Sequence, residues 1–423
     1  MTGPLRVAHV IDGLALGGAE RMLVELANRT VADGHVASVC VTRTDVTLAR
    51  RLDARVELLV LGRTTRFALA PLVRLARWLA DRQIHVVHCH GRSSFSLVAA
   101  LAATRAWRGP TLLHDHLGVQ LHPSVPRWFR LARHALAAYV AVDPAQRAWA
   151  ARAGVPAERV HVIANALDLA AVCRQPLTGD PLPAAPTATA AAAAADSATA
   201  TAADSAADSA ADSAAAAAAD SAAATATTSP ATATPHRPAG APARLIFVGG
   251  LRAEKAVDVL LEALRRLATP VVLYVVGGDA DPAYAAHLRA RAARADLAGR
   301  VAFLGPRTDA LPLAATADLA VHPARSESGP LVLAEYAALG VPFVASRVGG
   351  VAAALAGAGV GRFVPPDDPG ALAAAIDAVL AVPVADRRAL AAAARAVAVA
   401  ELDLAAVMPR WYTLYTSLRA APR

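Results

Sequence analysis

The chain has a single lysine among its 42 lysine and arginine residues, and its surroundings suit phosphate binding. Lys255 follows the strand-like stretch 243–250, which ends in two glycines, and it precedes a helical stretch. Backbone N–H groups point outward where such a helix begins, and the helix dipole favours negative charge there. Because Arg252 and Lys255 add two cations, we predict a diphosphate site. A solvated helix start in which Glu254 balances Lys255 is the alternative.

Two glutamates separated by seven residues indicate a second element of the site. Glu327 and Glu335 lie in "RSESGPLVLAEYAALG", directly after the strand-like stretch 317–324. A carboxylate at a loop edge and another about two turns into a helix lie on one side, where they can accept hydrogen bonds from sugar hydroxyls. The free N–H groups of Gly329 and of 331–333 are suited to phosphate. An ordinary helix with an acidic start is the alternative.

Apolar stretches that alternate with amphipathic ones must position these residues. Such alternation predicts parallel sheets covered by helices on both faces. We expect two Rossmann-like α/β domains, 1–177 and 243–423, with ligands at the strand carboxyl ends. The predicted strands are 5–11, 36–42, 85–90, 111–116, 138–143 and 159–165, then 243–250, 269–278, 300–305, 317–324, 341–346 and 361–366.

Residues 178–242 differ from the rest, since they consist almost entirely of Ala, Thr, Ser, Asp and Pro. Lacking aromatic residues to build a core, they are expected to be a low-complexity linker. The net charge is +8, and the basic excess lies before the linker. Anionic lipid, a charged acceptor or a general bias toward arginine each explain it. Nucleic acid is not expected, because no basic stretch carries a known reader motif.

Targeting signals are not visible, and the three cysteines, Cys40, Cys89 and Cys173, are scattered and odd in number. This pattern is typical of a reduced cytoplasmic protein. Two basic stretches with apolar spacing, 66–82 and 127–138, suit contact with an anionic membrane, which would place the protein peripherally at the inner membrane face. Helices that pack one face on a sheet explain the same pattern, and we favour this for either stretch alone.

Taken together, these stretches resemble retaining glycosyltransferases of family 4, which have the GT-B fold. The resemblance rests on "IDGLALGGAERMLVELA", "HVIANALDL", "FVGGLRAEKAVDVLLEAL", "ADLAVHPARSESGPLVLAEYAALGVPFVAS" and the terminal "WYTLYTSL". It covers nearly everything except 178–242. It implies two Rossmann-like domains facing across a cleft, with the C-terminal helix returning to the N-terminal domain.

The resemblance also implies roles for individual residues. Lys255 matches the lysine that neutralises the donor diphosphate, Glu327 the acid that binds donor-sugar hydroxyls, and Glu335 the acid that holds the ribose. Asn165 lies in the stretch that precedes the hinge. The other implied donor-binding residues are Gly17, Gly18, Arg252, Ser328, Gly329, Pro330, Leu331 and Val332.

Three positions depart from the family pattern, and one of them is Ala353, where the family often has an acid. The family's phosphate turn has an arginine where this chain has Gly250, and Arg252 is the candidate to replace it. The glycine that follows the family's lysine is Ala256 here. These departures put the second phosphate cation in doubt.

Histidines form His-x-His pairs in "HVVHCHG" and "TLLHDHLG". Such pairs can bind metals, but no acidic residues accompany them, and we expect no metal site. The resemblance instead places His114 near the donor sugar and acceptor, in a catalytic set with Glu327 and Lys255, with His116 as the alternative. We assign His88 and His90 to structure or to the acceptor side.

We therefore predict a retaining hexosyltransferase that uses a UDP- or GDP-sugar, without a cofactor or metal. Its acceptor would be a sugar, a lipid-linked molecule or a small molecule, in glycan, glycolipid or exopolysaccharide synthesis. The alternatives are a nucleotide-sugar epimerase, which needs acid and base carboxylates, and a catalytically silent GT-B binding module. Intact Lys255, Glu327 and Glu335 argue against the silent module, whereas Gly250 favours it.

Overall fold

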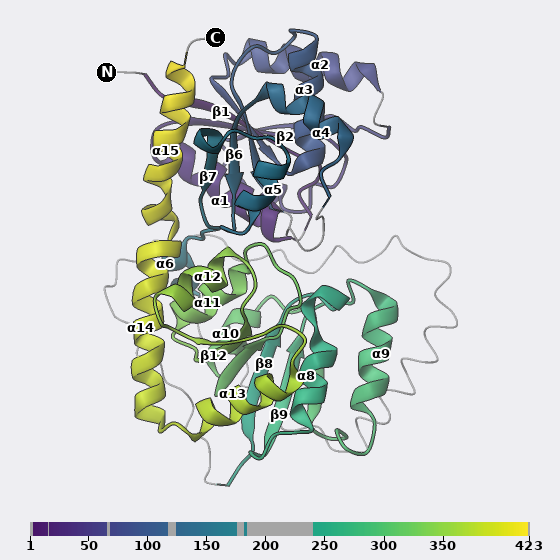
Figure 1. Cartoon of the computed structure of the whole chain (residues 1–423), viewed down its shortest axis with the longest axis vertical. Coiled ribbons are helices and arrows are strands. Elements are labelled where there is room, and N and C mark those ends of the chain that lie inside the picture. The colour runs from purple at the N-terminus through teal and green to yellow at the C-terminus, as the bar shows by residue number, and fades with distance from the viewer. Residues whose placement is uncertain are drawn as a thin grey trace.

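Two parallel sheets, each covered by helices on both faces, make up the computed structural model (Figure 1). The structure describes residues 3–15, 17–65, 68–116, 124–175, 182–183 and 240–421. The predicted α/β class is confirmed. The predicted boundary at residue 177, and nearly all of 178–242, lie outside the described residues.

The first sheet has the strand order β3-β2-β1-β4-β5-β6-β7. Both faces of the inner strands are buried, as a parallel sheet requires, whereas the edge strands β3 and β7 are partly exposed. Helices α2 and α3 cover one face, and α1 and α15 cover the other. The strands are β1 (Arg6–Ile11), β2 (Val36–Val41), β3 (Glu57–Val60), β4 (Val86–His90), β5 (Thr111–Asp115), β6 (Leu136–Ala141) and β7 (Val160–Val162); the helices of this half are α1 (Gly18–Ala32), α2 (Leu69–Asp81), α3 (Arg92–Ala103), α4 (Arg127–Ala132), α5 (Gln146–Arg152) and α6 (Leu169–Arg174).

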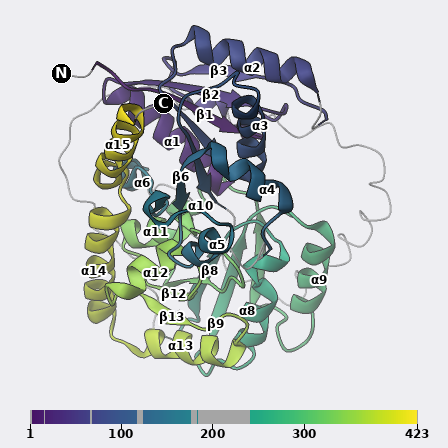
Figure 2. The same cartoon turned by 45° about the horizontal axis from the view of Figure 1, so that its top comes forward.

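The second sheet has the order β10-β9-β8-β11-β12-β13. Helices α8, α9 and α13 cover one face, and α10, α11, α12 and α14 cover the other. Figure 2 shows this half below the first. Its strands are β8 (Ala243–Val248), β9 (Val271–Val276), β10 (Val301–Gly305), β11 (Leu319–His322), β12 (Phe343–Ser346) and β13 (Arg362–Val364); its helices are α8 (Val257–Leu264), α9 (Pro282–Ala292), α10 (Ala310–Ala315), α11 (Leu331–Leu339), α12 (Gly350–Gly357), α13 (Pro369–Ala381), α14 (Val384–Leu402) and α15 (Leu404–Ala420).

Each sheet contains one point where the strand order reverses direction. In the first sheet it lies between β1 and β4, and in the second between β8 and β11. The loops that leave the carboxyl ends of two such strands diverge to opposite faces, and the space between them is where open α/β sheets bind ligands. The loops at these two reversal points carry the predicted donor-binding residues.

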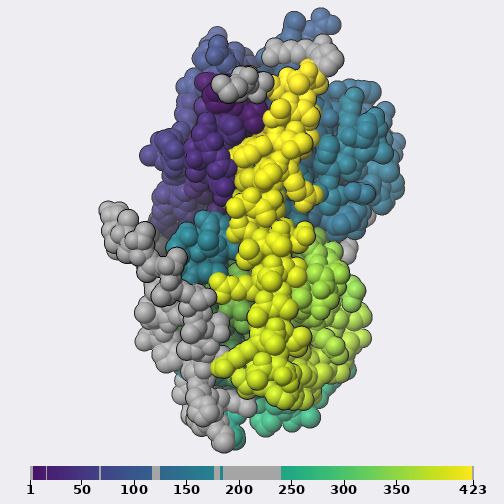
Figure 3. Space-filling view, turned by 90° about the vertical axis from the view of Figure 1, so that its left-hand side faces the viewer, coloured from purple at the N-terminus to yellow at the C-terminus, as the bar shows by residue number. Residues whose placement is uncertain are grey.

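The last helix of each half packs into the core of the other half. Leu404 N–H donates to the Leu167 carbonyl at 2.8 Å, and Leu167 N–H donates to the Leu402 carbonyl at 3.2 Å, so the chain crosses itself here. Beyond the crossing, α6 packs into the core of the second sheet and α15 into the core of the first. Figure 3 shows α14 and α15 running along both halves. The predicted return of the C-terminal helix is therefore confirmed.

Among the described residues, no single helix is long and apolar enough to cross a membrane. Only the pair α13 and α14 reaches the required length and composition, and it is bent by 113°.

We predict that Trp411→Ala lowers the free energy of unfolding by about 3–5 kcal/mol, because it removes a fully buried indole between α15 and the first sheet. The matched control is Trp128→Ala in α4, where the side chain is 39% exposed and the expected loss is below about 1 kcal/mol. Urea unfolding measures both. Equal losses for the two variants would contradict the docking of α15 described here.

Candidate active site

Lys255 and Glu327 meet at the reversal point of the second sheet. Lys255 ends the short 3₁₀ turn Ala253–Lys255 that follows β8, and Glu327 lies in the loop that follows β11. The Lys255 ammonium forms an ion pair with Glu327 Oε1. His322 Nε2 lies 3.3 Å from the same oxygen. The structure thus brings the predicted phosphate-binding cation and the predicted sugar-binding acid into direct contact.

The environment keeps Glu327 ionised. Burial by itself would raise the pKa of this carboxyl, but the Lys255 charge and the hydrogen bond to His322 outweigh burial and lower the pKa to about 2. Burial in turn lowers the pKa of His322, although Glu327 opposes that shift. At neutral pH the site therefore holds a carboxylate and an ammonium beside a neutral imidazole.

Arg325 joins the two loops, and the sequence analysis did not single it out. Its guanidinium bonds to both carboxylate oxygens of Asp258, at 2.9 and 2.6 Å, and to the Ala253 carbonyl at 2.8 Å. Its backbone N–H donates to the Glu254 carbonyl at 2.8 Å. A bidentate arginine fixes geometry as well as charge, so Arg325 holds the Lys255 turn against the Glu327 loop. Its place two residues before Glu327 was the available signal.

Arg252 lies beside the position where the family has its arginine. A Cβ added at Gly250 would lie 3.9 Å from Arg252 Nη2. Arg252 is exposed, and its charge also reaches Glu20 on α1 of the first half. The guanidinium therefore occupies the edge between the two halves, as a replacement for the missing arginine requires.

Ala256 has φ +54°, in the left-handed region that favours glycine. It lies between the Lys255 turn and α8 and is fully buried. This conformation explains why the family pattern has glycine here. The departure leaves the backbone path intact at the cost of local strain.

Residues 328–332 face the first half of the chain. The Ser328 hydroxyl donates to the His116 carbonyl, and Asn165 Nδ2 donates to the Gly329 carbonyl at 3.2 Å. Pro330 is the N-cap of α11, which Leu331 and Val332 begin. The predicted turn is therefore held by residues that follow β5 and β7.

The glycine loop after β1 also reaches this turn. A Cβ added at Gly18 would lie 3.7 Å from Leu331 Cδ1, and one added at Gly17 would collide with the Glu20 carboxylate. Gly18 thus lies at the contact with the second half, where the resemblance places it.

Glu335, in α11, is held from the opposite half. Its side chain is 5% exposed, and Oε1 lies 2.5 Å from Arg21 Nη1 of α1. The Arg21 partner was missed in the sequence analysis, although it lies in the same helix start as Gly18. In this conformation Arg21 compensates the carboxylate that the resemblance assigns to ribose.

His114 lies between the first sheet and α15. Its ring is fully buried, lies 3.2 Å from His88 Nε2 through Nδ1, and packs 4.9 Å from the Trp411 ring of α15. His116 is the histidine whose backbone meets Ser328. The catalytic role of His114 stays a prediction.

Solved structures of the same architecture cover the whole chain. A glycosyltransferase from Rickettsia africae covers 100% of both chains with a TM-score of 0.73 and 17% identity. HepE from Anabaena, solved with UDP, covers 98% of this chain and 100% of its own, with a TM-score of 0.71 and 18% identity. Two Rossmann-like halves arranged in this way define the GT-B fold.

Two family models match the chain, one in each half. Residues 16–171 match Glycosyltransferase Family 4, and residues 242–382 match Glycosyl transferases group 1. The chain belongs to this family of glycosyltransferases.

Curated relatives match over a shorter range. D-inositol 3-phosphate glycosyltransferase 2 of Catenulispora acidiphila is 40% identical over 153 residues, which are 33% of this chain and 36% of the relative. Glycogen synthase of Mycobacterium tuberculosis is 36% identical over 154 residues, which are 36% and 37% of the two chains. The chain therefore spans about a third of the length of these curated relatives.

We predict that Ala256→Gly is about 2 kcal/mol less destabilising than Ala263→Gly. Both alanines are fully buried and each variant removes one methyl group. Glycine relieves the left-handed strain at 256, whereas at 263, inside α8, it costs about 1 kcal/mol of helix propensity. Urea unfolding compares the two variants. Equal destabilisation would contradict the strain assigned to Ala256.

We predict that the stability deficit of Lys255→Met shrinks as the pH falls from 5 to 3. In the native protein the lowered pKa of Glu327 stabilises the fold above the ordinary value of 4.5, and that contribution is lost as the pH falls through about 2. Without the ammonium, burial raises the pKa, so protonation stabilises the variant instead. The measurement is the unfolding free energy of both proteins across this range, with Lys255→Arg as the charge-retaining control. A deficit independent of pH would show that Lys255 does not set the ionisation of Glu327.

Proposed function

We propose that this protein is a retaining glycosyltransferase that moves a sugar from a nucleoside diphosphate sugar to an acceptor hydroxyl. The observation that carries the proposal is the meeting of Lys255 and Glu327 at the β8–β11 reversal point, opposite the Gly17–Gly18 loop of β1. Lys255 offers a cation for phosphate and Glu327 an acid for sugar hydroxyls. The glycine loop allows a ligand to approach its backbone closely. Family membership supports the same reaction.

Departure of the nucleoside diphosphate builds negative charge that the site must stabilise. Lys255 and Arg252 supply two positive charges, and the start of α11 supplies backbone N–H groups. This set needs no metal or cofactor. Attack from the face that the diphosphate leaves would retain the anomeric configuration, with the phosphate taking the acceptor proton.

Transfer is tested by supplying UDP- and GDP-sugars with simple sugar acceptors and following nucleotide release. We expect one nucleotide class to be turned over, and NMR of the product to show the anomeric configuration of the donor. Glu327→Gln should lower kcat by at least about 100-fold, since it removes charge at the reacting sugar. Glu262→Gln, at a partly exposed acid of α8 that pairs with Arg265 and Arg291, is the control with unchanged rate. Nucleotide binding with no turnover of any donor would favour a silent binding module.

We also propose a cytoplasmic location with peripheral contact to an anionic membrane, which suits a lipid-linked acceptor in glycolipid or polysaccharide synthesis. A groove of about 1130 Å³ in the first half is lined by Leu72 of α2 and by Trp128 and Leu131 of α4. Leu131 is 79% exposed, and Leu69 at the start of α2 is 75% exposed. The exposed arginines of these two helices are Arg74, Arg77, Arg127 and Arg130. Apolar side chains flanked by arginine are typical of interfacial helices.

Liposome cosedimentation tests this contact. We expect binding to vesicles that contain phosphatidylglycerol, weaker binding to pure phosphatidylcholine, and a loss of at least about fivefold in Leu131→Ala, which is about 1 kcal/mol. Leu390→Ala on α14 removes an equally apolar side chain, 59% exposed, from the other half and is the matched control. Equal effects of the two variants, or no preference for anionic lipid, would overturn the proposed surface.

A further inference from the structure

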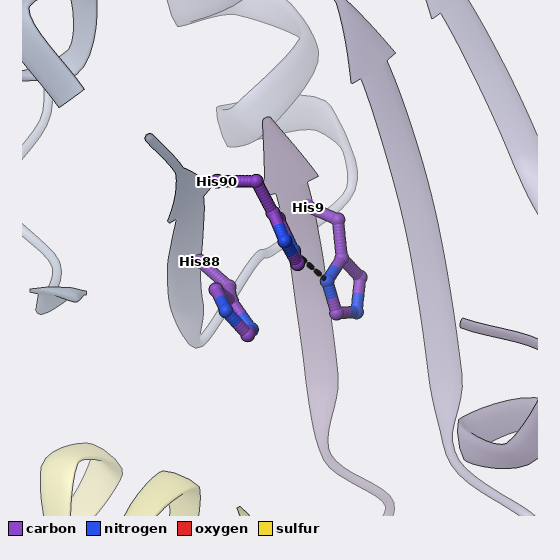
Figure 4. A group of neighbouring side chains, drawn as sticks. All are labelled: His9, His88 and His90. Carbon is purple, nitrogen blue, oxygen red and sulfur yellow. Dashed lines mark hydrogen bonds between the residues drawn. The ribbon is translucent and has the colours of Figure 1, made fainter. Parts of the chain in front are cut away.

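Five histidines form one layer between the first sheet and helices α1 and α15. His9 lies on β1, His88 and His90 on β4, and His114 and His116 at the end of β5. The strands pair in register, with His9 opposite His88 and His90 opposite His114, so all the rings project from one face. His88 stacks on His90 with ring centroids 4.1 Å apart. Figure 4 shows His9, His88 and His90 pointing toward one another.

The ring nitrogens outnumber their protein partners. His9 Nδ1 lies 3.0 Å from His90 Nε2, His90 Nδ1 lies 3.1 Å from His116 Nε2, and His88 Nε2 lies 3.2 Å from His114 Nδ1. Among the described residues, His9 Nε2 and His114 Nε2 are buried without a hydrogen-bond partner. Such atoms are rare and each costs about 1–3 kcal/mol. The histidine layer therefore has ring nitrogens that are available to bind a ligand.

The spacing of the nitrogens suits a metal ion. One nitrogen each from His9, His88 and His90 lies within 4.8 Å of the other two, and the triplet His90, His114 and His116 meets the same condition. Ligands about 2.0–2.1 Å from a tetrahedral Zn²⁺ are about 3.3 Å apart. The nitrogen–nitrogen distances of 3.0 to 3.2 Å are close to this separation between ligands. Small ring rotations would therefore turn hydrogen-bonded pairs into a ligand set.

The first triplet also has outer partners that would orient its rings. His88 Nδ1 lies 2.8 Å from the Tyr415 hydroxyl of α15, so Nε2, which contacts His114 Nδ1 at 3.2 Å in this structure, is the nitrogen that would turn to a metal. His90 Nδ1 faces His116 Nε2, which leaves its own Nε2 on the side of His9. Ligating histidines characteristically bond through their second nitrogen in this way. This arrangement favours His9, His88 and His90 over the second triplet.

We propose that His9, His88 and His90 bind one divalent transition-metal ion of the class that prefers imidazole, such as Zn²⁺, Ni²⁺ or Co²⁺. Three nitrogen ligands without a carboxylate select against Mg²⁺ and Ca²⁺. The ion joins β1 to β4 and, through Tyr415, fastens α15 to the sheet. The sequence analysis expected no metal because no acidic residues accompany the two His-x-His pairs; His9, which completes the triplet, lies about 80 residues earlier in the chain.

The test uses the full chain, purified without a histidine tag and stripped with EDTA. We expect one equivalent of Zn²⁺ to bind in competition with a chromophoric chelator, and Co²⁺ to give the intense visible absorption of a tetrahedral site. His9→Gln should weaken Zn²⁺ binding at least 10-fold. His287→Gln, on an exposed face of α9, is the matched control and should bind as the native protein does.

Tyr415→Phe removes only the outer partner of His88 and keeps the ring packed, so it should fold and still lose about 10-fold in affinity. This variant decides the matter if His9→Gln does not fold. Absence of stoichiometric binding, or equal weakening by His287→Gln, would overturn the site. Weaker Zn²⁺ binding in His116→Gln together with unchanged binding in His9→Gln would also overturn the proposed site, in favour of the second triplet.

Discussion

One ion pair holds together the region on which the proposed chemistry depends. Lys255 and Glu327 come from loops that follow β8 and β11, strands adjacent in space but separated by two others in the chain. Each charge compensates the other in partly buried surroundings, where an unpaired ion is costly. A nucleotide sugar offers both groups new partners, since the diphosphate can take the ammonium and the sugar hydroxyls can take the carboxylate. The pair therefore preserves both charges until a donor replaces their mutual contact.

The rest of the architecture brings the loops at the two reversal points face to face. Both sheets reverse their strand order once, and the loops from the two reversal points meet: Gly18 lies beside Leu331, and Arg21 reaches Glu335. The crossing at Leu167 and Leu404 fastens each half to an element of the other. Because α15 belongs by packing to the first sheet, movement of the second half against the first must bend the chain near this crossing.

Much of this arrangement was predictable from sequence because it rests on local patterns. Buried parallel strands give apolar runs, and the glycine turn before Lys255 and the spacing of Glu327 and Glu335 mark helix starts at strand ends. What could not be predicted depends on contacts between distant segments. Arg21 and Arg325 act through partners on other elements, and their places in the sequence beside Gly18 and Glu327 do not reveal those partners. His114 was assigned by resemblance alone, and whether a strand-end side chain faces a helix or the ligand depends on where α15 packs.

The most direct test of the account is the binding of UDP and GDP, without added metal, to the native protein and to Lys255→Arg. If Lys255 is the compact charge that a diphosphate requires, one nucleotide should bind with micromolar affinity and the substitution should weaken it at least 10-fold, which is about 1.4 kcal/mol. Arginine keeps the charge but changes its shape, so a large effect would locate the phosphate at this residue. Equal affinity of the two proteins, or no binding of either nucleotide to the native protein, would contradict the central claim.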